Sequence, residues 1–370
     1  MDKKIFSNIG KIIERDSKST TYKFALLRGT IDIIQENSPY IYQKKNRVYL
    51  PTGLLIEKWL LYYYPIFQSK TLVPQINGNS NLAFELKFNE VIKYYEPRGG
   101  FSAFYNDLRN KGFPNEINRS FFNLVKQLLK TITDMPMKYI GKSVNSKEYS
   151  IYKFENNNQS RKITNIGIEE LINNFGVFSI PLDYYEVFQI LGSFLNGQDS
   201  ILFKWAEFSV NASNQNLSTE RVLNEILKSP ITERNISESK KIYKEILEEQ
   251  GDIYCVWTGK KLANYEIDHL IPFSVWKNND LWNLLPAKST INKKKRDKIP
   301  SPLIIEKQKD LILEYWQIIY NAQTERFSKE IQVSLLGNLP FESWKKTGIN
   351  QLKDSCSYLI KNRGFKEWKI

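Results

Sequence analysis

The chain has 370 residues, 41% hydrophobic and 25% charged, which is enough for packed cores in two or three domains and excludes wholesale disorder. Its 53 Lys and Arg outnumber its 40 Asp and Glu, for a formal net charge of +13, and such an excess attracts polyanions such as nucleic acid or an anionic membrane surface. Charge alone does not decide the partner, because many AT-rich genomes encode Lys-rich proteins that have no nucleic-acid role.

Cysteine content and hydropathy exclude several further classes of protein. Two cysteines, Cys255 and Cys356, exclude a disulfide framework and a four-cysteine zinc site. The first ten residues lack the apolar run of a signal peptide. The most apolar stretch, residues 54–67, is too short to span a bilayer and contains Glu57 and Lys58. We therefore expect a soluble cytoplasmic protein that does not enter a membrane.

The N-terminal part is predicted to be mainly helical. Apolar residues at helical spacing predict a first helix at residues 22–34, after Ser and Thr caps at residues 19–21. A second helix is expected at residues 53–64, because Pro51 suits its start and Pro65 its end. The same spacing predicts further helices at residues 81–95, 101–110 and 117–131.

The pattern changes near residue 139. Short apolar segments alternate with Asn- and Ser-rich turns, which predicts a small β-hairpin or meander at residues 139–140, 149–154 and 162–163. Helical spacing resumes in segments that begin near residue 182 and continue at residues 201–208, 220–227 and 237–249. The polar stretches 156–160 and 211–216 are either hinges between subdomains or exposed turns, and we favour turns.

Two clusters of tyrosines, at residues 62–64 and 94–95, have two interpretations. Aromatic rings can stack on nucleic-acid bases, which would place the clusters on a binding surface. At helical spacing, however, such clusters are more typical of a hydrophobic core. We favour the core, so neither cluster enters the predicted site.

Residues 251–300 differ from the rest of the chain. They have little helical periodicity, are rich in Asn and Lys, and contain nine Lys or Arg against five Asp or Glu, a net charge of +4. An amphipathic helix is predicted directly after them at residues 303–320, followed by helical segments to the C-terminus. Most of the residue pairs with obvious chemistry fall in this segment of fifty residues.

Asp268 and His269 place a carboxylate next to the chain's only imidazole. Phosphodiester hydrolysis needs a base that deprotonates water near neutral pH, and imidazole suits that task. It also needs positive charge near the phosphate and the departing oxygen, which a hard divalent cation can supply. Neighbouring side chains of a strand point to opposite faces. A dyad that shares one site therefore requires a bend or loop, and Pro272 lies shortly downstream.

Two asparagines follow the histidine at fixed separations. Asn283 lies 14 residues after His269, and Asn292 lies 23 residues after it. Asn292 opens a basic run that suits a helix laid against a phosphate backbone, and its amide oxygen can complete a metal site. The basic residues that would hold the strand are Lys293, Lys294, Lys295 and Arg296, with Lys260 and Lys261 as weaker candidates.

The segment from Tyr254 to Pro300 resembles the HNH nuclease domain, also called the ββα-metal or His-Me finger domain. The shared features, in order, are Cys-x-x-Thr-Gly-Lys, Asp-His-x-x-Pro, Trp-Asn-Leu and Asn-x-x-Lys. The spacing from the histidine to the two asparagines resembles that of the HNH domain in RNA-guided CRISPR effectors. The resemblance covers roughly fifty residues of 370. It is specific because four elements occur in the right order at the right separations.

The resemblance implies a role for each matching residue. His269 would be the general base, while Asp268 and Asn292 would hold the metal ion. Asn283 would be a structural residue that ties the loop to the β-hairpin and fixes the pose of the histidine. Because the third position is Asn292 rather than a second histidine, the ion expected is Mg²⁺ or Mn²⁺ rather than zinc.

This chain departs from the family pattern at one point. Many HNH domains carry two Cys-x-x-Cys pairs that bind a structural zinc, whereas here Cys255 is followed by Thr258, so no structural zinc is expected. The hairpin would then be held by apolar packing. The candidates for this packing are Tyr254, Val256, Trp257, Ile267, Ile271 and Trp282.

Each candidate also has an ordinary structural interpretation. His269 can be an inert buried histidine, Asp268 a turn carboxylate, and Asn292 a helix N-cap. The basic run can be a solvated face. We favour the catalytic interpretation because the only histidine falls inside the dyad, with both asparagines at the family's spacing.

We therefore expect an α+β, mainly α protein with three parts. Residues 1–250 form a helical recognition, oligomerisation or regulatory region, residues 251–302 the HNH domain, and residues 303–370 a C-terminal helical segment. The resemblance implies metal-assisted hydrolysis of DNA in preference to RNA, leaving 5′-phosphate and 3′-hydroxyl ends. It also implies a role in restriction or phage defence, with a homodimer or a regulatory subunit as partner. The alternatives are a catalytically silent nucleic-acid-binding or scaffold protein, and an RNA nuclease.

Overall fold

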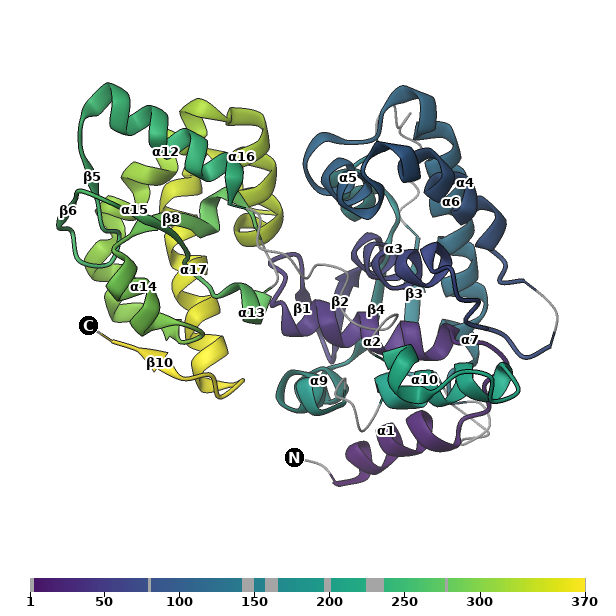
Figure 1. The fold of residues 1–370 in the computed structure, drawn as a ribbon. Helices are drawn as coiled ribbons and strands as arrows, with labels where there is room; N and C mark the ends of the chain where they lie inside the picture. Colours follow the sequence, from purple (N-terminus) through teal and green to yellow (C-terminus); the bar gives the residue numbers. More distant parts are fainter. Residues whose placement is uncertain are drawn as a thin grey trace. The chain divides into compact units, whose positions relative to one another are not determined.

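The computed structural model describes residues 3–78, 81–141, 150–156, 166–195, 201–223, 236–276 and 279–369. This part of the chain is mainly helical with small sheets, as expected for an α+β, mainly α protein. It divides into two compact units, unit 1 (Met1–Pro230) and unit 2 (Ile231–Ile370) (Figure 1). Among the described helices, none is both long enough and apolar enough to cross a membrane.

Unit 1 is built mostly of helices. They are α1 (Lys3–Arg15), α2 (Tyr22–Gln35), α3 (Thr52–Gln68), α4 (Glu85–Tyr95), α5 (Gly100–Asn106), α6 (Asn115–Asp134), α7 (Pro136–Tyr139), α8 (Ile168–Asn174), α9 (Leu182–Leu195), α10 (Ile201–Ala212) and α11 (Thr219–Arg221). The helices predicted from apolar spacing are confirmed at α2, α4, α6, α9 and α10. A π-helical turn, η2 (Asp107–Lys111), continues α5, and residues 224–227 of the helix predicted at 220–227 lie outside the described residues.

Helix α3 does not stop where the sequence predicts. Pro65 lies inside it, and the helix continues to Gln68. A proline within a helix removes one hydrogen bond and clashes with the preceding turn, at a cost of about 3 kcal/mol. Here Tyr63, Tyr64 and Ile66 are buried around that position, and the burial of each large apolar side chain contributes about 1.5–3 kcal/mol. The burial of these side chains therefore outweighs the cost of a proline inside the helix.

The sheet of unit 1 is antiparallel and differs from the predicted meander. Its strands are β1 (Tyr42–Lys44), β2 (Arg47–Pro51), β3 (Lys153–Glu155) and β4 (Val177–Pro181), in the order β1-β2-β4-β3. Of the predicted meander, only β3 is found as a strand. Tyr139 ends helix α7 instead, and residues 149 and 162–163 lie outside the described residues. The strand predicted at residues 139–140 was wrong. β3 pairs instead with β4, and β4 pairs with β2, more than a hundred residues before it, a pairing for which local alternation carries no signal.

The core of unit 1 is aromatic. Tyr63 packs against Trp59 and Trp205, with ring centroids 5.6 Å apart in both pairs, and against Phe84 at 5.0 Å. Residues 62–64 are all buried, and so is Tyr95. The core interpretation of the tyrosine clusters is therefore confirmed for these residues.

The two charged residues inside the apolar stretch 54–67, Glu57 and Lys58, are buried and both form ion pairs. Lys58 Nζ donates to Glu36 at 2.6 Å, and Arg109 Nε lies 3.2 Å from Glu57 Oε1. Desolvation raises the pKa of Glu36, against the opposing effect of Lys58. Pairing is what allows charged groups to occupy a buried helix, since an isolated buried charge costs several kcal/mol.

The described residues of unit 2 form helices and three pairs of short strands. Its helices are α12 (Ser237–Gln250), α13 (Phe273–Trp276), α14 (Ser289–Lys295), α15 (Pro302–Ala322), α16 (Thr324–Ile331) and α17 (Trp344–Lys361). Its strands are β5 (Ile253–Tyr254), β6 (Lys261–Leu262), β7 (Glu266–His269), β8 (Leu284–Ala287), β9 (Ile299–Pro300) and β10 (Glu367–Trp368). β5–β6 and β7–β8 are antiparallel, whereas β9–β10 is parallel.

The strands of unit 2 pack between α12 and the C-terminal helices. Tyr243 of α12 donates through its hydroxyl to the Leu284 carbonyl at 3.0 Å, and Trp316 of α15 donates to the Trp282 carbonyl at 2.8 Å. One hydrophobic cluster contains residues from α12, the strands, α15 and α17. Helix α12 therefore packs with unit 2, so the expected division after residue 250 lies downstream of the boundary between the two units.

Most of the residues predicted to hold the hairpin are in this core. The buried ones are Val256, Trp257, Ile267, Ile271 and Trp282. Tyr254 was wrongly included, because its side chain is 37% exposed. Alternate residues of a strand face opposite sides, and in β5 it is Ile253 that faces the core.

Asn283 joins two segments of unit 2. It lies in the short 3-10 helix η4 (Leu281–Asn283), is fully buried, and uses both ends of its side-chain amide on Ile271. Its Oδ1 accepts from the Ile271 N–H at 2.8 Å, and its Nδ2 donates to the Ile271 carbonyl at 3.0 Å. The Leu270 N–H also donates to the Asn283 backbone carbonyl at 2.7 Å. The loop directly after His269 is therefore held by one asparagine.

The close approach of α3 to α8 leaves no room for a side chain at Gly53. A Cβ added there would lie 1.9 Å from the backbone oxygen of Leu171, whereas one added at Gly10 in α1 meets nothing within 4 Å. We predict that Gly53→Ala lowers the free energy of unfolding of unit 1 by about 3 kcal/mol, because the helices must separate. Gly10→Ala should instead raise it by about 0.5–1 kcal/mol. Urea denaturation followed by circular dichroism distinguishes the two variants. Equal midpoints would contradict the close packing of α3 against α8.

Asn283→Ala removes the side-chain amide that pairs with the backbone N–H and carbonyl of Ile271, both in a buried core. Each buried group left unpaired costs about 1–3 kcal/mol, so we predict a loss of about 2–5 kcal/mol in the unfolding free energy of unit 2. The control is Asn321→Ala, because Asn321 is exposed on α15 and should change stability by less than about 0.5 kcal/mol. A loss no larger than that of the control would show that the tie is not needed for folding.

Candidate active site

Asp268 and His269 are the last two residues of strand β7. They pair with β8 in antiparallel register, Asp268 opposite Leu285 and His269 opposite Leu284. The expected bend at the dyad was wrong, because both residues lie within the strand. Their side chains therefore leave the strand on opposite faces, and each has its own set of neighbours.

The Asp268 carboxylate is held by two donors from other elements. Trp257 Nε1 donates to Oδ2 at 2.6 Å, and Lys295 Nζ lies 3.2 Å from Oδ1. Asp268 is 5% exposed and Lys295 is fully buried. Lys295 also donates to the His269 backbone carbonyl at 2.6 Å and lies 5.4 Å from the centre of the Trp257 ring. The buried negative charge is thus balanced by a buried ammonium and an indole N–H, as burial of a carboxylate requires.

The His269 imidazole lies on the other face. It is 3% exposed, its ring centroid is 5.5 Å from that of Phe273, and its Nε2 is 3.2 Å from Asn279 Oδ1. An amide oxygen can only accept a hydrogen bond, so this contact places the ring proton of the neutral imidazole on Nε2. Nδ1 is then the nitrogen with the basic lone pair.

Asn292 is the fourth residue of α14, directly after β8. The N-cap of this helix is Lys288, so the N-cap interpretation of Asn292 was wrong. Its Nδ2 donates to Glu266 Oε2 at 3.0 Å. Glu266 is two residues before Asp268 and therefore on the same face of β7. Hydrogen bonds from Ser289 and, more weakly, Asn292 hold the pKa of Glu266 below its usual value. The ionised Glu266 accepts from the NH₂ group of the Asn292 side chain, so the amide oxygen of Asn292 points away from Glu266.

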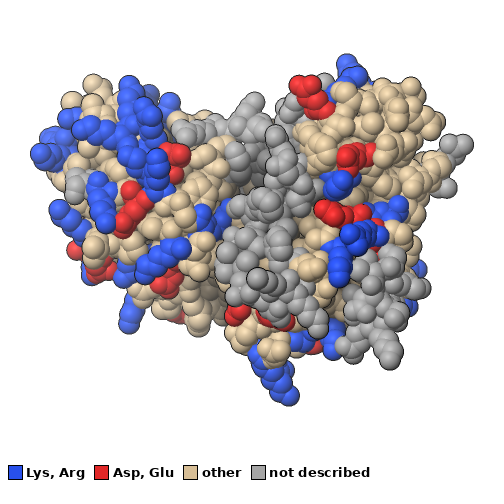
Figure 2. Space-filling model, turned by 90° about the horizontal axis from the view of Figure 1, so that it is seen from below, with Lys and Arg blue, Asp and Glu red and all other residues tan. Residues whose placement is uncertain are grey.

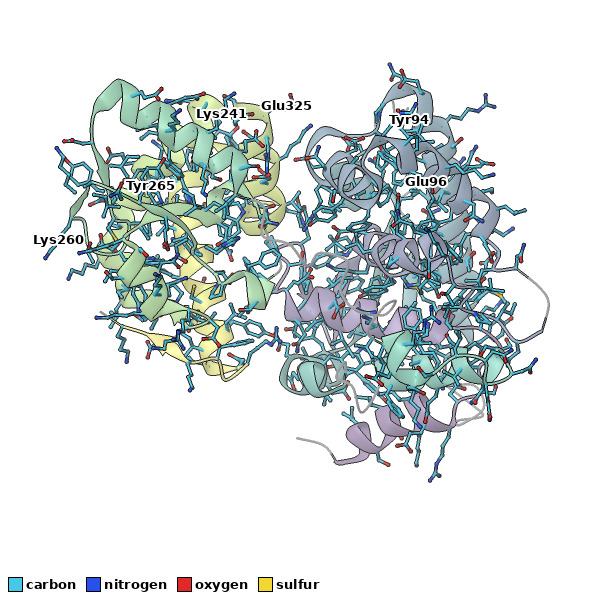
Figure 3. The ribbon with its side chains drawn as sticks, viewed as in Figure 1. Tyr94, Glu96, Lys241, Lys260, Tyr265 and Glu325 are labelled. Carbon is cyan, nitrogen blue, oxygen red and sulfur yellow. The ribbon has the colours of Figure 1, made fainter. Side chains whose placement is uncertain are left out.

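The basic run divides into two groups. Lys293, Lys294 and Arg296 are exposed, whereas Lys295 turns inward to Asp268 and is not part of the solvated face. In the opening turn, the Lys260 side chain extends outward from the unit (Figure 3). Lys261 forms an ion pair with Asp252. The fully buried Lys295 is the one member that cannot track a DNA backbone along the surface.

The donor atoms near β7 suit a hydrated, oxygen-liking ion. Asp268 supplies a carboxylate and Asn292 an amide oxygen, and a carboxylate that accepts two hydrogen bonds still has lone pairs for a cation. Within the described ranges, no group of three or more His, Cys, Asp or Glu side chains could hold a metal. Mg²⁺ is commonly held by one or two protein oxygens and several waters, so the residues present fit Mg²⁺ or Mn²⁺.

Three neighbours of the site were not found from the sequence as functional residues. Glu266 had a usable signal, because it stands two residues before Asp268 and shares its face of the strand. Trp257 was predicted only as a packing residue, although its N–H contacts the carboxylate. Asn279 had no signal, since only the fold brings it to the imidazole.

Comparison with known proteins finds two family models that match this chain. A family model described as "Domain of unknown function (DUF8808)" matches residues 2–226, and a model described as "HNH endonuclease" matches residues 255–301. The chain is also similar to the CRISPR-associated endonuclease Cas9 of Listeria innocua serovar 6a, at 30% identity over 103 residues. That match covers 26% of this chain and 7% of the relative, so the chain spans only a small part of its length. No solved structure matches the chain.

The first family model spans more than half of the chain, and the second covers the strands and helix that carry Asp268, His269, Asn283 and Asn292. The HNH resemblance seen in the motifs and the match to a family model come from the same fifty residues. The chain therefore belongs to the family described as a domain of unknown function (DUF8808), and its residues 255–301 are an HNH endonuclease domain.

Proposed function

We propose that this protein is a metal-dependent endonuclease that hydrolyses DNA phosphodiester bonds. His269 acts as general base, and Asp268 and Asn292 hold a Mg²⁺ or Mn²⁺ ion in a ββα-metal arrangement formed by β7, β8 and α14. One observation carries the proposal: β7 ends in an adjacent carboxylate and imidazole, and α14 brings the Asn292 amide to the Asp268 face through Glu266.

In an in-line displacement, the two faces of β7 would have different roles, one supplying the general base and the other the ligands of the metal ion. His269 Nδ1 takes a proton from the attacking water, while Asn279 holds Nε2–H and keeps the ring in that tautomer. The water oxygen bonds to phosphorus and the bond from phosphorus to the 3′ oxygen breaks. The departing 3′ oxygen takes a proton from solvent water, and the products are a 5′-phosphate and a 3′-hydroxyl. A divalent ion held by Asp268 and Asn292 would supply positive charge to the phosphate and the departing oxygen.

Lys295 and Trp257 position the Asp268 carboxylate in this mechanism. Both donate to it from elements other than β7, so the carboxylate cannot rotate away without breaking two buried contacts. Removing Asp268 would take away the carboxylate that balances the buried ammonium of Lys295, and breaking a buried ion pair in this way typically costs about 3–5 kcal/mol. Asp268 variants therefore test folding as much as catalysis, and His269 and Asn292 are the better probes of chemistry.

The proposal extends to the biological role. An HNH domain joined to a large helical region suits a nuclease of restriction or phage defence, with residues 1–250 serving recognition, oligomerisation or regulation. One site makes one cut in each protomer, so a double-strand break requires a homodimer or two successive nicks. A regulatory partner subunit would restrain the nuclease in its host.

Plasmid cleavage tests the catalytic assignment. We expect nicking or linearisation of supercoiled DNA with Mg²⁺ or Mn²⁺, its loss in EDTA, and a decrease of about 10²- to 10⁴-fold in rate for His269→Ala, because a positioned base contributes that much. Asn321→Ala serves as the matched surface control and should cleave like the wild type. Cleavage that persists in His269→Ala would overturn the mechanism. Binding of DNA without cleavage in any of these ions would identify a catalytically silent protein.

Metal binding can be measured without turnover. We predict that Asn292→Ala lowers the affinity for Mn²⁺ by about tenfold or more, equivalent to about 1.4 kcal/mol, because one of the two protein ligands is lost. Electron paramagnetic resonance of free Mn²⁺ measures this in the absence of DNA. Asn321→Ala is again the control. Unchanged Mn²⁺ affinity in a folded Asn292→Ala protein would exclude Asn292 as a ligand.

A further inference from the structure

Unit 2 has an open cleft of about 730 Å³ that the catalytic residues do not line. One wall is the end of α14 and the turn that follows it, and the other is the C-terminal segment, residues 364–369. Six of its lining residues are cationic, against the single carboxylate of Asp297: Lys293, Lys294, Arg296, Lys298, Lys366 and Lys369. Figure 2 looks at unit 2 from the side where β10 lies in Figure 1 and shows many Lys and Arg side chains there, with fewer acidic ones.

The two walls are held together although they are far apart in the sequence. Strand β10 pairs in parallel with β9, with Glu367 opposite Ile299. The Ile299 N–H donates to the Lys366 carbonyl at 2.9 Å, and the Ser301 N–H donates to the Trp368 carbonyl at 3.1 Å. These backbone bonds fix the C-terminal segment against the turn after α14, so the cleft is a feature of the fold.

Little of the positive charge in the cleft is neutralised by the protein. Lys369 pairs with Glu367 at 2.8 Å. Within the part of the chain that the structure describes, Lys293, Lys294, Arg296 and Lys366 form no ion pair. Exposed cations held close together repel one another and raise the local potential, and a polyanion lowers that energy. Arg296 also has a backbone φ of 52°, a strained conformation of the kind that clusters at ligand sites.

The cleft is linked to the candidate active site in two ways, by sequence proximity and by side-chain contacts. Lys293 and Lys294 follow Asn292 within one helical turn, about 5.4 Å along the axis. On the opposite wall, the buried ring of Trp368 packs edge-on against Trp257 with centroids 4.9 Å apart, and Trp257 donates to the Asp268 carboxylate. The C-terminal segment therefore contacts the residue that positions the proposed metal ligand.

We propose that this cleft binds the phosphodiester backbone of DNA on one side of the scissile phosphate, and that the C-terminal segment supplies two of its six cations, Lys366 and Lys369. The inference rests on the proposed function for the identity of the ligand. DNA carries one negative charge for each ~1.7 Å of its axis, so a cleft with six cations can neutralise several successive phosphates. The C-terminal segment then belongs to the substrate site, although it lies outside residues 255–301.

Binding without cleavage tests the cleft separately from the catalytic proposal. The variant is Lys366→Gln with Lys369→Gln, measured in the full chain by fluorescence anisotropy on a DNA duplex in EDTA over a series of salt concentrations. Each lost phosphate contact reduces the slope of log K against log salt by about 0.9. We therefore expect a slope shallower by about 2 and weaker binding at every salt concentration.

The matched control is Lys345→Gln with Lys346→Gln. It removes the same charge from exposed lysines near the start of α17, and this helix of 18 residues separates them from the C-terminal segment by about 27 Å. The control should keep the wild-type slope. Equal slopes in the two double variants would contradict the proposal that the cleft binds DNA. So would a wild-type slope in Lys366→Gln with Lys369→Gln. A shallower slope only in the cleft variant supports it, even if the wild type fails to cleave, and that failure would count against the catalytic proposal alone.

Discussion

The structure of the site depends on one buried carboxylate. Asp268 is 5% exposed, and burial of its charge is tolerable only because Lys295 and Trp257 donate to it. Lys295 comes from α14 and Trp257 from the turn after β5, so this one group determines how the helix and both strand pairs pack together. Trp368 then packs on Trp257 and brings the C-terminal segment to the same place. A carboxylate held by two buried donors has its orientation set before any ligand binds.

The opposite face of β7 is controlled by a second chain of contacts. Asn283 holds the loop after His269 through Ile271. The 3-10 helix that carries Asn283 is in turn held by the C-terminal helices, since Glu330 accepts from the Leu281 N–H at 2.6 Å and Trp316 donates to the Trp282 carbonyl. The helices after residue 302 therefore support the pose of the imidazole, and unit 2 packs around a single core.

The tyrosine cluster at residues 62–64 of unit 1 serves packing. Tyr62, Tyr63 and Tyr64 are buried in its core, and the charges of Glu57 and Lys58 are paired within it. Rings that are enclosed in this way cannot stack on bases. In unit 2, six cationic side chains line the cleft between α14 and the C-terminal segment.

The sequence by itself determined the features that depend on local order. Helical spacing located α2, α4, α6, α9, α10 and α15, because a period of 3.6 residues is visible within one segment. The order and spacing of Asp268, His269, Asn283 and Asn292 identified the HNH domain. Only the tertiary structure decided the rest, namely the sheet of unit 1, the inward turn of Lys295, the bond from Glu266 to Asn292 and the pairing of β9 with β10. These contacts join residues that are distant in the chain or select one rotamer of a flexible side chain, and packing energy decides both.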